Sequence, residues 1–508
     1  MKNSIGREIP DEYGRGHLYN GAFSVKPDMK LYAPPVKAVK PGSKKLMESI
    51  EDVFKRIPIQ DGMTLSFHHH LRNGDYVLNM VLAVADKLNI KNLNIAISSI
   101  FPIHEPLIEY IKKGVVTGID TDYMSGPVAK AISKGILKKP VIFRTHGGRA
   151  RAIASGQLKI DVAFLAAPAA DMYGNINGIE GATACGSLGY ALVDARYADC
   201  VVAITDHLRP YPLIPASINQ TEVDYVVVVD SIGDPEGIIS GTTQLTKNPI
   251  SLNIAKKAAD VIEASGLLKE GFSFQTGAGG ASLATAAFLK EKMEQKHICG
   301  NFALGGITKY IVEMQKAGLF RVLFDSQSFD LDAVKSIRTN SNHVEISANM
   351  YANPFNKGCV VNQLDVAVLG ATEIDTDFNV NVITGSNGVI MGGSGGHSDA
   401  AAGAKMTMIV TPLIRKRLPI IVDKVTTVST PGETVDVVVT ERGIAVNPRR
   451  KELRDALIKS GISIVNINEL KEKAESLTGK PDIVTHEGPV VGLVEYRDGT
   501  LIDVIHKV

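Results

Sequence analysis

Two glycine-rich stretches of this sequence place bare backbone beside few polar side chains. Residues 277–282 read GAGGAS, and residues 381–405 read NVITGSNGVIMGGSGGHSDAAAGAK. A glycine loop that opens a helix leaves backbone N–H groups free, and such groups stabilise an anion or the oxyanion of an acyl-transfer reaction. We therefore predict that both stretches line an active site; the alternative is that each forms only tight turns.

These loops supply most of the candidate site residues. The catalytic candidates are Gly277, Gly279, Gly280, Ser386 and Asn387. The candidates for substrate binding are Gly388, Gly392, Gly393, Gly395, Gly396 and His397. Asp399 is expected to cap the helix that follows it. A dinucleotide site is not expected, because GAGGAS lacks the GxGxxG spacing.

The elements that must position these loops alternate between strands and helices. Continuous apolar runs at 141–145, 161–167, 200–205 and 225–230 are typical of buried parallel strands, and the stretch 126–137 is typical of a helix. This alternation predicts an α/β fold in which helices cover both faces of mostly parallel sheets.

An internal repeat indicates how these elements are grouped. Asp161, Asp171 and Asn175 recur, at one constant offset, as Asp365, Asp375 and Asn379. Three further segments of the first half match segments of the second. The matched pairs are 61–67 with 270–276, 129–145 with 309–325, and 186–189 with 393–396.

The repeat predicts two structurally similar α/β domains in tandem. We place them at residues 1–238 and 239–508, because polar turn formers cluster around the boundary. A small β addition follows at the C-terminal end, where Asp498-Gly499 between two alternating runs indicates a hairpin over 490–505.

Composition and charge exclude several other functions. A chain of 508 residues with a formal net charge of +1 shows no electrostatic footprint for nucleic acid or an acidic membrane. The N-terminus lacks an apolar signal core, and no run approaches the roughly 20 apolar residues of a membrane span. The four cysteines and the run His68-His69-His70 lack metal-ligand spacing, so no metal site is expected. We expect a cytoplasmic enzyme with reduced thiols.

The glycine loops resemble those of the CoA-transferases, which carry a Gly-Gly-x-Gly-Gly segment followed by a polar residue and an aspartate. Here that segment is 392–399. A closer likeness is to the citrate lyase alpha chains, and it extends over nearly the whole chain. The segments that carry it are 166–181, 275–284, 347–382 and 385–399. The resemblance implies two tandem CoA-transferase-like domains.

Ser386 departs from the wider family, in which a glutamate at this place is the covalent nucleophile. Serine has no carbonyl to hold a thiol, so a glutamyl thioester cannot form there. The resemblance therefore implies a direct exchange through a mixed anhydride, in which acetyl on the thiol of an acyl carrier protein is replaced by citryl. The glycine loops would stabilise the oxyanions of this exchange.

The resemblance also implies the partners of the chain. They are a citrate lyase beta chain and a gamma acyl carrier protein, in an oligomeric complex. No tightly bound cofactor is expected, because the CoA-like phosphopantetheine arm arrives with the carrier or as acetyl-CoA. Citrate is a trianion near neutral pH, so Arg144, His146 and Arg149, just after a predicted strand, are candidates for binding it. A solvated basic turn is the alternative for these three.

Two other functions stay open at this point. The first is a covalent CoA-transferase or acyl-CoA hydrolase that uses another carboxylate, such as Glu373 or Glu345. The second is a non-catalytic scaffold that only docks the lyase and carrier chains.

Overall fold

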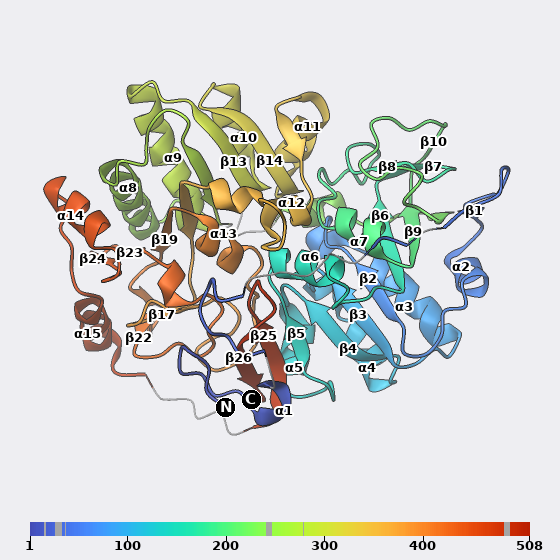
Figure 1. The fold of residues 1–508 in the computed structure, drawn as a ribbon, viewed down its shortest axis with the longest axis horizontal. Helices are drawn as coiled ribbons and strands as arrows, with labels where there is room; N and C mark the ends of the chain where they lie inside the picture. Colours follow the sequence, from blue (N-terminus) through green and yellow to red (C-terminus); the bar gives the residue numbers. More distant parts are fainter. Residues whose placement is uncertain (15–16, 26–32, 36, 240–245, 278, 482–487) are drawn as a thin grey trace.

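The computed structural model describes residues 1–508 except 15–16, 26–32, 36, 240–245, 278 and 482–487. Two large, mostly parallel sheets dominate it (Figure 1). The first sheet has the order β1 (Leu46–Met47), β11 (Tyr225–Val228), β9 (Cys200–Thr205), β6 (Val162–Ala167), β2 (Thr64–Phe67), β3 (Leu93–Ile97), β4 (Val116–Thr121), β5 (Val141–Phe143), β25 (Val490–Glu495) and β26 (Leu501–His506). The second has the order β15 (His343–Glu345), β14 (Phe320–Ser328), β13 (Gly300–Ile307), β12 (Ser273–Thr276), β16 (Val366–Leu369), β19 (Met406–Val410), β23 (Val437–Thr440) and β24 (Gly443–Val446). The predicted α/β class is confirmed.

Helices cover the two sheets. In the first half they are α2 (Ile50–Arg56), α3 (Val77–Lys87), α4 (Leu107–Lys112), α5 (Gly126–Ser133), α6 (His146–Ala154) and α7 (Ala191–Tyr197), after the short N-terminal α1 (Asp11–Gly14). In the second half they are α8 (Pro249–Ala264), α9 (Gly280–Gln295), α10 (Lys309–Lys316), α11 (Leu331–Thr339), α12 (Ala348–Ala352), α13 (His397–Gly403), α14 (Lys451–Lys459) and α15 (Ile467–Thr478). Local sequence explains their starts: Asn248 accepts hydrogen bonds from the first amides of α8, and Pro249 needs no acceptor there.

The two halves have the same strand order, so the predicted repeat is confirmed. In the first half β6 lies between β2 and β9, and in the second half β16 lies between β12 and β19. Each half also has a matching small sheet. These are β10 (Leu208–Arg209), β7 (Ala169–Asp171) and β8 (Ile176–Asn177), and β22 (Ile421–Val422), β17 (Glu373–Asp375) and β18 (Val380–Asn381).

The repeated polar residues have a structural role. The carboxylate of Asp161 accepts a hydrogen bond from the Thr64 amide at 2.7 Å, and that of Asp365 accepts one from the Ser273 amide at 2.9 Å. Each of these bonds joins two neighbouring strands at their start. Asp171 and Asp375 likewise accept hydrogen bonds from the asparagine four residues on, in the turn that follows each small strand.

Two sequence-based assignments are wrong: the match between 129–145 and 309–325, and the place of the C-terminal hairpin in the second domain. The segment 309–325 forms α10 and β14, whose counterparts in the first half are α4 and β4 rather than 129–145. A helix that ends at glycine before a strand occurs in several units of such a fold, so the motif could not identify the unit.

The hairpin of β25 and β26 forms as predicted, but it extends the first sheet: β25 lies parallel to β5. The boundary at residue 238 stays a prediction, since 240–245 lie outside the described residues.

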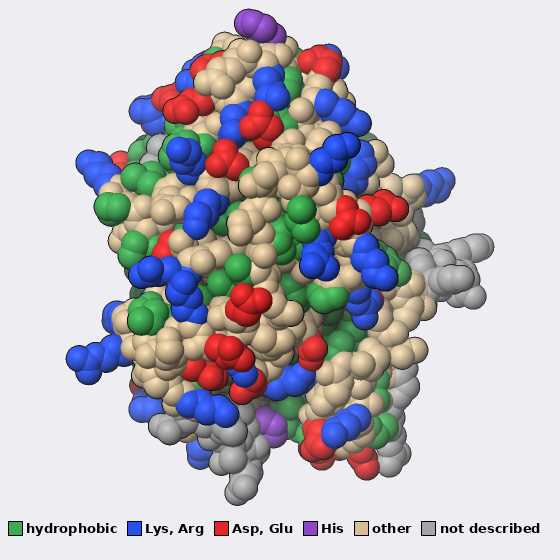
Figure 2. All heavy atoms as spheres, turned by 90° about the vertical axis from the view of Figure 1, so that its left-hand side faces the viewer, with side chains coloured by type: hydrophobic (Ala, Val, Ile, Leu, Met, Phe, Trp, Pro, Cys, Tyr) green, Lys and Arg blue, Asp and Glu red, His purple; other side chains and the backbone are tan. Residues whose placement is uncertain are grey.

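Surface charge is mixed on the face that carries α8, α14 and α15. Figure 2 shows Lys and Arg interspersed there with Asp and Glu, and neither sign forms a continuous field. Among the helices formed by the described residues, none is long and apolar enough to cross a membrane.

Candidate active site

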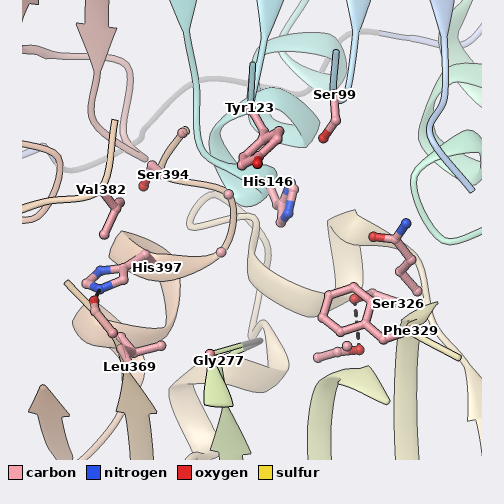
Figure 3. Close-up of a pocket in the computed structure, with 18 of the residues that line it drawn as sticks. Ser99, Tyr123, His146, Gly277, Ser326, Phe329, Leu369, Val382, Ser394 and His397 are labelled. Carbon is pink, nitrogen blue, oxygen red and sulfur yellow. Dashed lines mark hydrogen bonds between the residues drawn. The ribbon is translucent and has the colours of Figure 1, made fainter. Parts of the chain in front are cut away.

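A cavity of about 450 Å³ lies between the two halves, where the strands of both sheets end. Parallel strands bind ligands at their carboxyl ends, and here the ends of β2, β3 and β4 meet those of β12, β14 and β16. In Figure 3, Ser99, Tyr123 and His146 lie on one side of the open space and Gly277 on the opposite side. The cavity therefore brings a polar wall of the first half opposite a backbone loop of the second.

The GAGGAS loop opens onto this cavity. Gly277 and Gly279 line it, and Gly280 is the first residue of α9. A Cβ at Gly277 or Gly279 would meet no atom of the described residues nearer than 3.6 Å, so both positions have room for a Cβ. The Gly277 amide donates to the Val368 carbonyl at 2.8 Å. The Gly277 amide is therefore used within the protein and is not an oxyanion donor. In the described part of the chain, the first helical hydrogen bond of α9 runs from the Leu283 amide to the Gly279 carbonyl, so the amides of Gly280 to Ser282 precede it.

The second glycine segment has a different reason for its composition. Gly393, Gly395 and Gly396 also line the cavity. A Cβ at Gly393 would lie 2.1 Å from the Asp122 carbonyl oxygen, and one at Gly396 would lie 2.3 Å from the Tyr351 hydroxyl. Gly392 lies outside the lining, and its Cβ would collide with Val382. Glycine is needed at these positions for close packing.

This packing joins the two halves reciprocally. Gly395 accepts a hydrogen bond from the His146 amide at 2.9 Å, at the start of α6. In the matching segment, Gly189 accepts one from the Ala348 amide at 2.9 Å, at the start of α12. The repeated segments 186–189 and 393–396 therefore each cross to the other half.

Residues Ser386, Asn387 and Gly388 lie apart from the cavity. They form a tight turn in which the Gly388 amide donates to the Gly385 carbonyl at 2.9 Å. Gly388 has a φ of +77°, which favours glycine, and Asn387 is exposed. None of the three lines the cavity, so the structure does not bring this turn together with the GAGGAS loop.

The two predicted arginines are buried in internal ion pairs. Arg144 donates to Asp120 at 2.7 Å and also bonds Glu495. Arg149 donates two hydrogen bonds to Asp194, at 2.8 and 2.6 Å. Neither arginine lines the cavity, and their guanidinium groups are occupied by carboxylates of the protein itself. The alternative of a solvated basic turn is wrong for both, because they are buried.

His146 is the member of the predicted trio that does line the cavity. Its Nδ1 lies 2.8 Å from an Asp122 carboxylate oxygen, and its Nε2 lies near Gly395 at the cavity edge. Burial raises the pKa of Asp122, and the hydrogen bond and charge of His146 oppose that rise. A carboxylate on Nδ1 orients the imidazole and leaves Nε2 to meet a ligand.

His397 lines the cavity with both ring nitrogens occupied. Nδ1 lies 2.7 Å from the Thr430 hydroxyl, and Nε2 lies 2.9 Å from the Gly370 carbonyl oxygen. Burial lowers the pKa of His397 to about 4, so the ring is neutral near pH 7. It lines the cavity as an uncharged ring.

Asp399 does not cap its own helix. It lies in the first turn of α13, and its carboxylate accepts hydrogen bonds from the Thr145 hydroxyl at 2.9 Å and the Gly147 amide at 2.8 Å. Arg497 also lies within 3.3 Å of it. Asp399 therefore binds the start of α6 in the other half, a contact that helix propensity cannot predict.

Several cavity residues were not predicted from the sequence. Arg72 is the only lysine or arginine among the described lining residues, and His69 and Gln327 line the cavity beside it. Other unpredicted lining residues are Ser99, Tyr123, Tyr190, Gln275, Ser326 and Tyr351. Most follow or end strands, so the rule for strand ends in α/β folds could have found them. Glu345 and Glu373, the candidate nucleophiles, are not among the lining residues.

Two α/β units joined around a cavity at their strand ends define a CoA-transferase-like protein. Its fold is shared by a chain of a Pseudomonas malonate decarboxylase hetero-tetramer, which is 15% identical, covers 86% of this chain and 88% of that one, and has a TM-score of 0.63. Residues 43–508 match the family described as "Citrate lyase, alpha subunit (CitF)", and the chain belongs to that family.

Relatives of this chain agree over most of its length. The citrate lyase alpha chain of Escherichia coli (strain K12) is 52% identical over 471 residues, which cover 93% of this chain and 92% of the relative. That of Klebsiella pneumoniae is 52% identical over 92% of both chains. A crystal structure described as the putative alpha subunit of citrate lyase from Streptococcus mutans in complex with citrate is 53% identical. It covers 100% of both chains, with a TM-score of 0.98.

Proposed function

We propose that this protein is the citrate CoA-transferase chain of a citrate lyase complex. It exchanges acetyl for citryl on the CoA-like thiol of an acyl carrier protein and releases acetate. The observation that carries the proposal is the cavity, in which a cationic, hydrogen-bonding wall faces a glycine loop at a helix start. Membership of the citrate lyase alpha subunit family supports it.

Arg72 is the residue to which we assign citrate binding. It follows β2, and its guanidinium lies over two rings, 5.5 Å from the centre of Phe101 in the first half and 4.8 Å from that of Phe329 in the second. Stacking of this kind holds the planar guanidinium, which can bind a carboxylate by two hydrogen bonds. Ser99 and Tyr123 lie on the same wall and offer hydroxyl groups for the other oxygens of a polycarboxylate.

His146 supplies a further hydrogen bond on this wall. Asp122 holds its Nδ1, so Nε2 meets a citrate oxygen at the cavity edge. Because Asp122 acts only through the imidazole, it is a positioning residue in this scheme.

The exchange needs no covalent bond to the protein. A citrate carboxylate attacks the acetyl carbonyl, and the C–S bond breaks to release the thiolate and leave a mixed anhydride. The thiolate then attacks the citryl carbonyl, and acetate leaves. Both steps pass through a tetrahedral oxyanion. In this scheme the amides of Gly279 and Gly280, at the positive end of α9, stabilise it. No tightly bound cofactor takes part, because the CoA-like arm enters as part of the substrate.

An exchange assay tests this function against a scaffold role. The full chain is incubated with acetyl-CoA and citrate, and citryl-CoA and acetate are measured by mass spectrometry. Formation of both products supports a transferase. A correctly folded chain that forms neither, with acetyl-CoA or with the acetylated carrier protein, would leave only the scaffold role.

Replacement of Arg72 should weaken citrate binding selectively. A charge-assisted hydrogen bond contributes about 1.5–3 kcal/mol, so Arg72→Met should raise the KM for citrate on the order of tenfold to a hundredfold. The KM for acetyl-CoA should change little, and Arg72→Lys should give an intermediate value because it keeps the charge but not the planar fork. Equal rises in both KM values would contradict the assignment and indicate general distortion of the cavity.

We also predict that no enzyme-bound thioester accumulates. The carboxylates of Glu373 and Glu345 are engaged in hydrogen bonds with the protein itself: Glu373 accepts them from Asn381 and Thr426, and Glu345 accepts one from the Leu188 amide. After incubation with acetyl-CoA and reduction with borohydride, mass spectrometry should find no glutamate converted to its alcohol. A known covalent CoA-transferase treated in parallel serves as the positive control. Reduction at Glu373 or Glu345 would replace direct exchange with a covalent mechanism.

A further inference from the structure

Gln275 is a cavity residue with only one end of its side-chain amide in use. It lies on β12, lines the cavity and is buried. Its Nε2 donates a hydrogen bond to the Tyr351 hydroxyl at 2.8 Å. Its Oε1 is also buried, but it has no hydrogen-bond partner among the described residues. Leaving a buried acceptor without a donor costs free energy, so this atom indicates a ligand that supplies the donor.

Gln327 provides a contrast within the same cavity. Its Oε1 lies 2.9 Å from Nε2 of His69, and its own Nε2 donates to the His69 carbonyl at 3.0 Å. Both ends of this amide are therefore used by the protein itself, in a contact that joins the two halves. The open end of Gln275 is not a general property of the glutamines that line the cavity.

Close packing holds the Gln275 amide in place. A Cβ at Gly305, where φ is +103°, would lie 3.2 Å from Cδ and Nε2 of Gln275, so the backbone of β13 packs against the amide. A Cβ at Gly396 would lie 2.3 Å from the Tyr351 hydroxyl that accepts from Nε2. Tyr351 therefore fixes which atom of the amide stays open. A group that is already ordered loses little conformational entropy when a ligand binds.

The internal repeat shows that the fold does not require a glutamine at this position. Gln275 pairs with Ala367 across β12 and β16, and Ser66 pairs with Ala163 in the same way across β2 and β6. Ser66 is thus the corresponding residue of the first half, and it does not line the cavity. Because a short side chain fits the same place in the sheet, strand packing alone does not explain a long amide at position 275.

The chemistry of citrate identifies the group that this acceptor would bind. Near neutral pH the three ionised carboxylates of citrate only accept hydrogen bonds, and its tertiary hydroxyl is its one donor. The wall to which we assign the carboxylates supplies donors, from Arg72, Ser99 and Tyr123 (Figure 3). We propose that Gln275 Oε1 accepts a hydrogen bond from the citrate hydroxyl and thereby selects hydroxy acids over analogues that lack this group. The inference rests on the proposed function, since it requires that citrate bind in this cavity.

Binding of citrate and of tricarballylate, which has a hydrogen in place of the hydroxyl, tests this selection. Calorimetry on the full chain measures both dissociation constants without acyl exchange. The unchanged chain should bind citrate about tenfold to a hundredfold more tightly, because tricarballylate leaves Oε1 buried and unpaired. Gln275→Met keeps the length of the side chain but removes the acceptor, so the two dissociation constants should become nearly equal.

Two further variants accompany this one, and circular dichroism confirms that each is folded. Tyr351→Phe removes the hydroxyl that holds Nε2, and it should reduce the preference for citrate. Gln60→Met is the matched control, because Gln60 is exposed and does not line the cavity, and it should keep the full preference.

The possible failures of this inference and of the proposed function can be told apart. Equal affinities for the two acids in the unchanged chain, or an unchanged preference in Gln275→Met, would overturn the inference: the amide would then bind a carboxylate or serve only the fold. An unchanged chain that does not bind citrate would overturn the assignment of the cavity as well. A chain that prefers citrate but catalyses no exchange would support the inference and contradict only the transferase.

Discussion

Gly279→Val is expected to slow acyl exchange by about a hundredfold or more while the protein stays folded. Gly279 is the N-cap of α9 with a φ of −76°, which valine tolerates. Among the described residues, its Cβ would meet only the Ser282 hydroxyl, at 3.7 Å. The cost in folding should therefore be about 1 kcal/mol. The valine methyl groups would occupy the space through which the thioester approaches the amides of α9.

Melting temperature and steady-state rate, measured on one purified variant, separate the two possible roles of this loop. Gly358→Val is the matched control, because Gly358 is exposed and its Cβ would meet nothing within 4 Å. It should change neither quantity. A Gly279→Val protein with a lowered melting temperature, whose folded fraction keeps full specific activity, would show that the loop is only a structural turn.

Arg149→Met is expected to destabilise the protein by about 3–5 kcal/mol, the usual cost of removing one partner from a buried ion pair. The arginine binds both oxygens of Asp194, and Asp194 also lies 3.0 Å from His68 in the same buried site. Burial acts to raise the pKa of Asp194, but the charges of Arg149 and His68 outweigh it and hold that pKa well below its ordinary value. The substitution would leave a buried carboxylate without its main counter-charge.

Denaturant unfolding measures this loss, and Arg321→Met is the control. Arg321 forms an exposed ion pair with Glu270 at 2.7 Å, and its removal should cost under about 1 kcal/mol. Because the pKa of Asp194 is depressed by folding, the pair stabilises the protein above the unfolded-state pKa of about 4, and that stabilisation is lost as the pH falls below it. A folded Arg149→Met protein of unchanged stability with a raised KM for citrate would restore Arg149 as a substrate ligand.

Pattern and spacing alone are sufficient to predict much of this fold. Apolar runs without alternation indicate buried parallel strands, and the recurrence of Asp161 and Asp171 as Asp365 and Asp375 indicates two like halves. The hairpin at Asp498-Gly499 is also predicted, because a short turn depends on local backbone preference. These features depend on residues close together in the chain, which is why sequence periodicity reports them.

The role of each glycine and arginine was decided only by the tertiary structure. Gly279 and Gly396 occur in similar sequence, yet Gly279 has room for a Cβ and Gly396 packs against Tyr351. Arg144 is buried because Glu495, far along the chain, reaches it when the C-terminal hairpin joins the first sheet. A local pattern carries no information about such distant partners. The sequence could therefore predict that a strand end is part of a site, but not which side chains at that strand end contact a ligand.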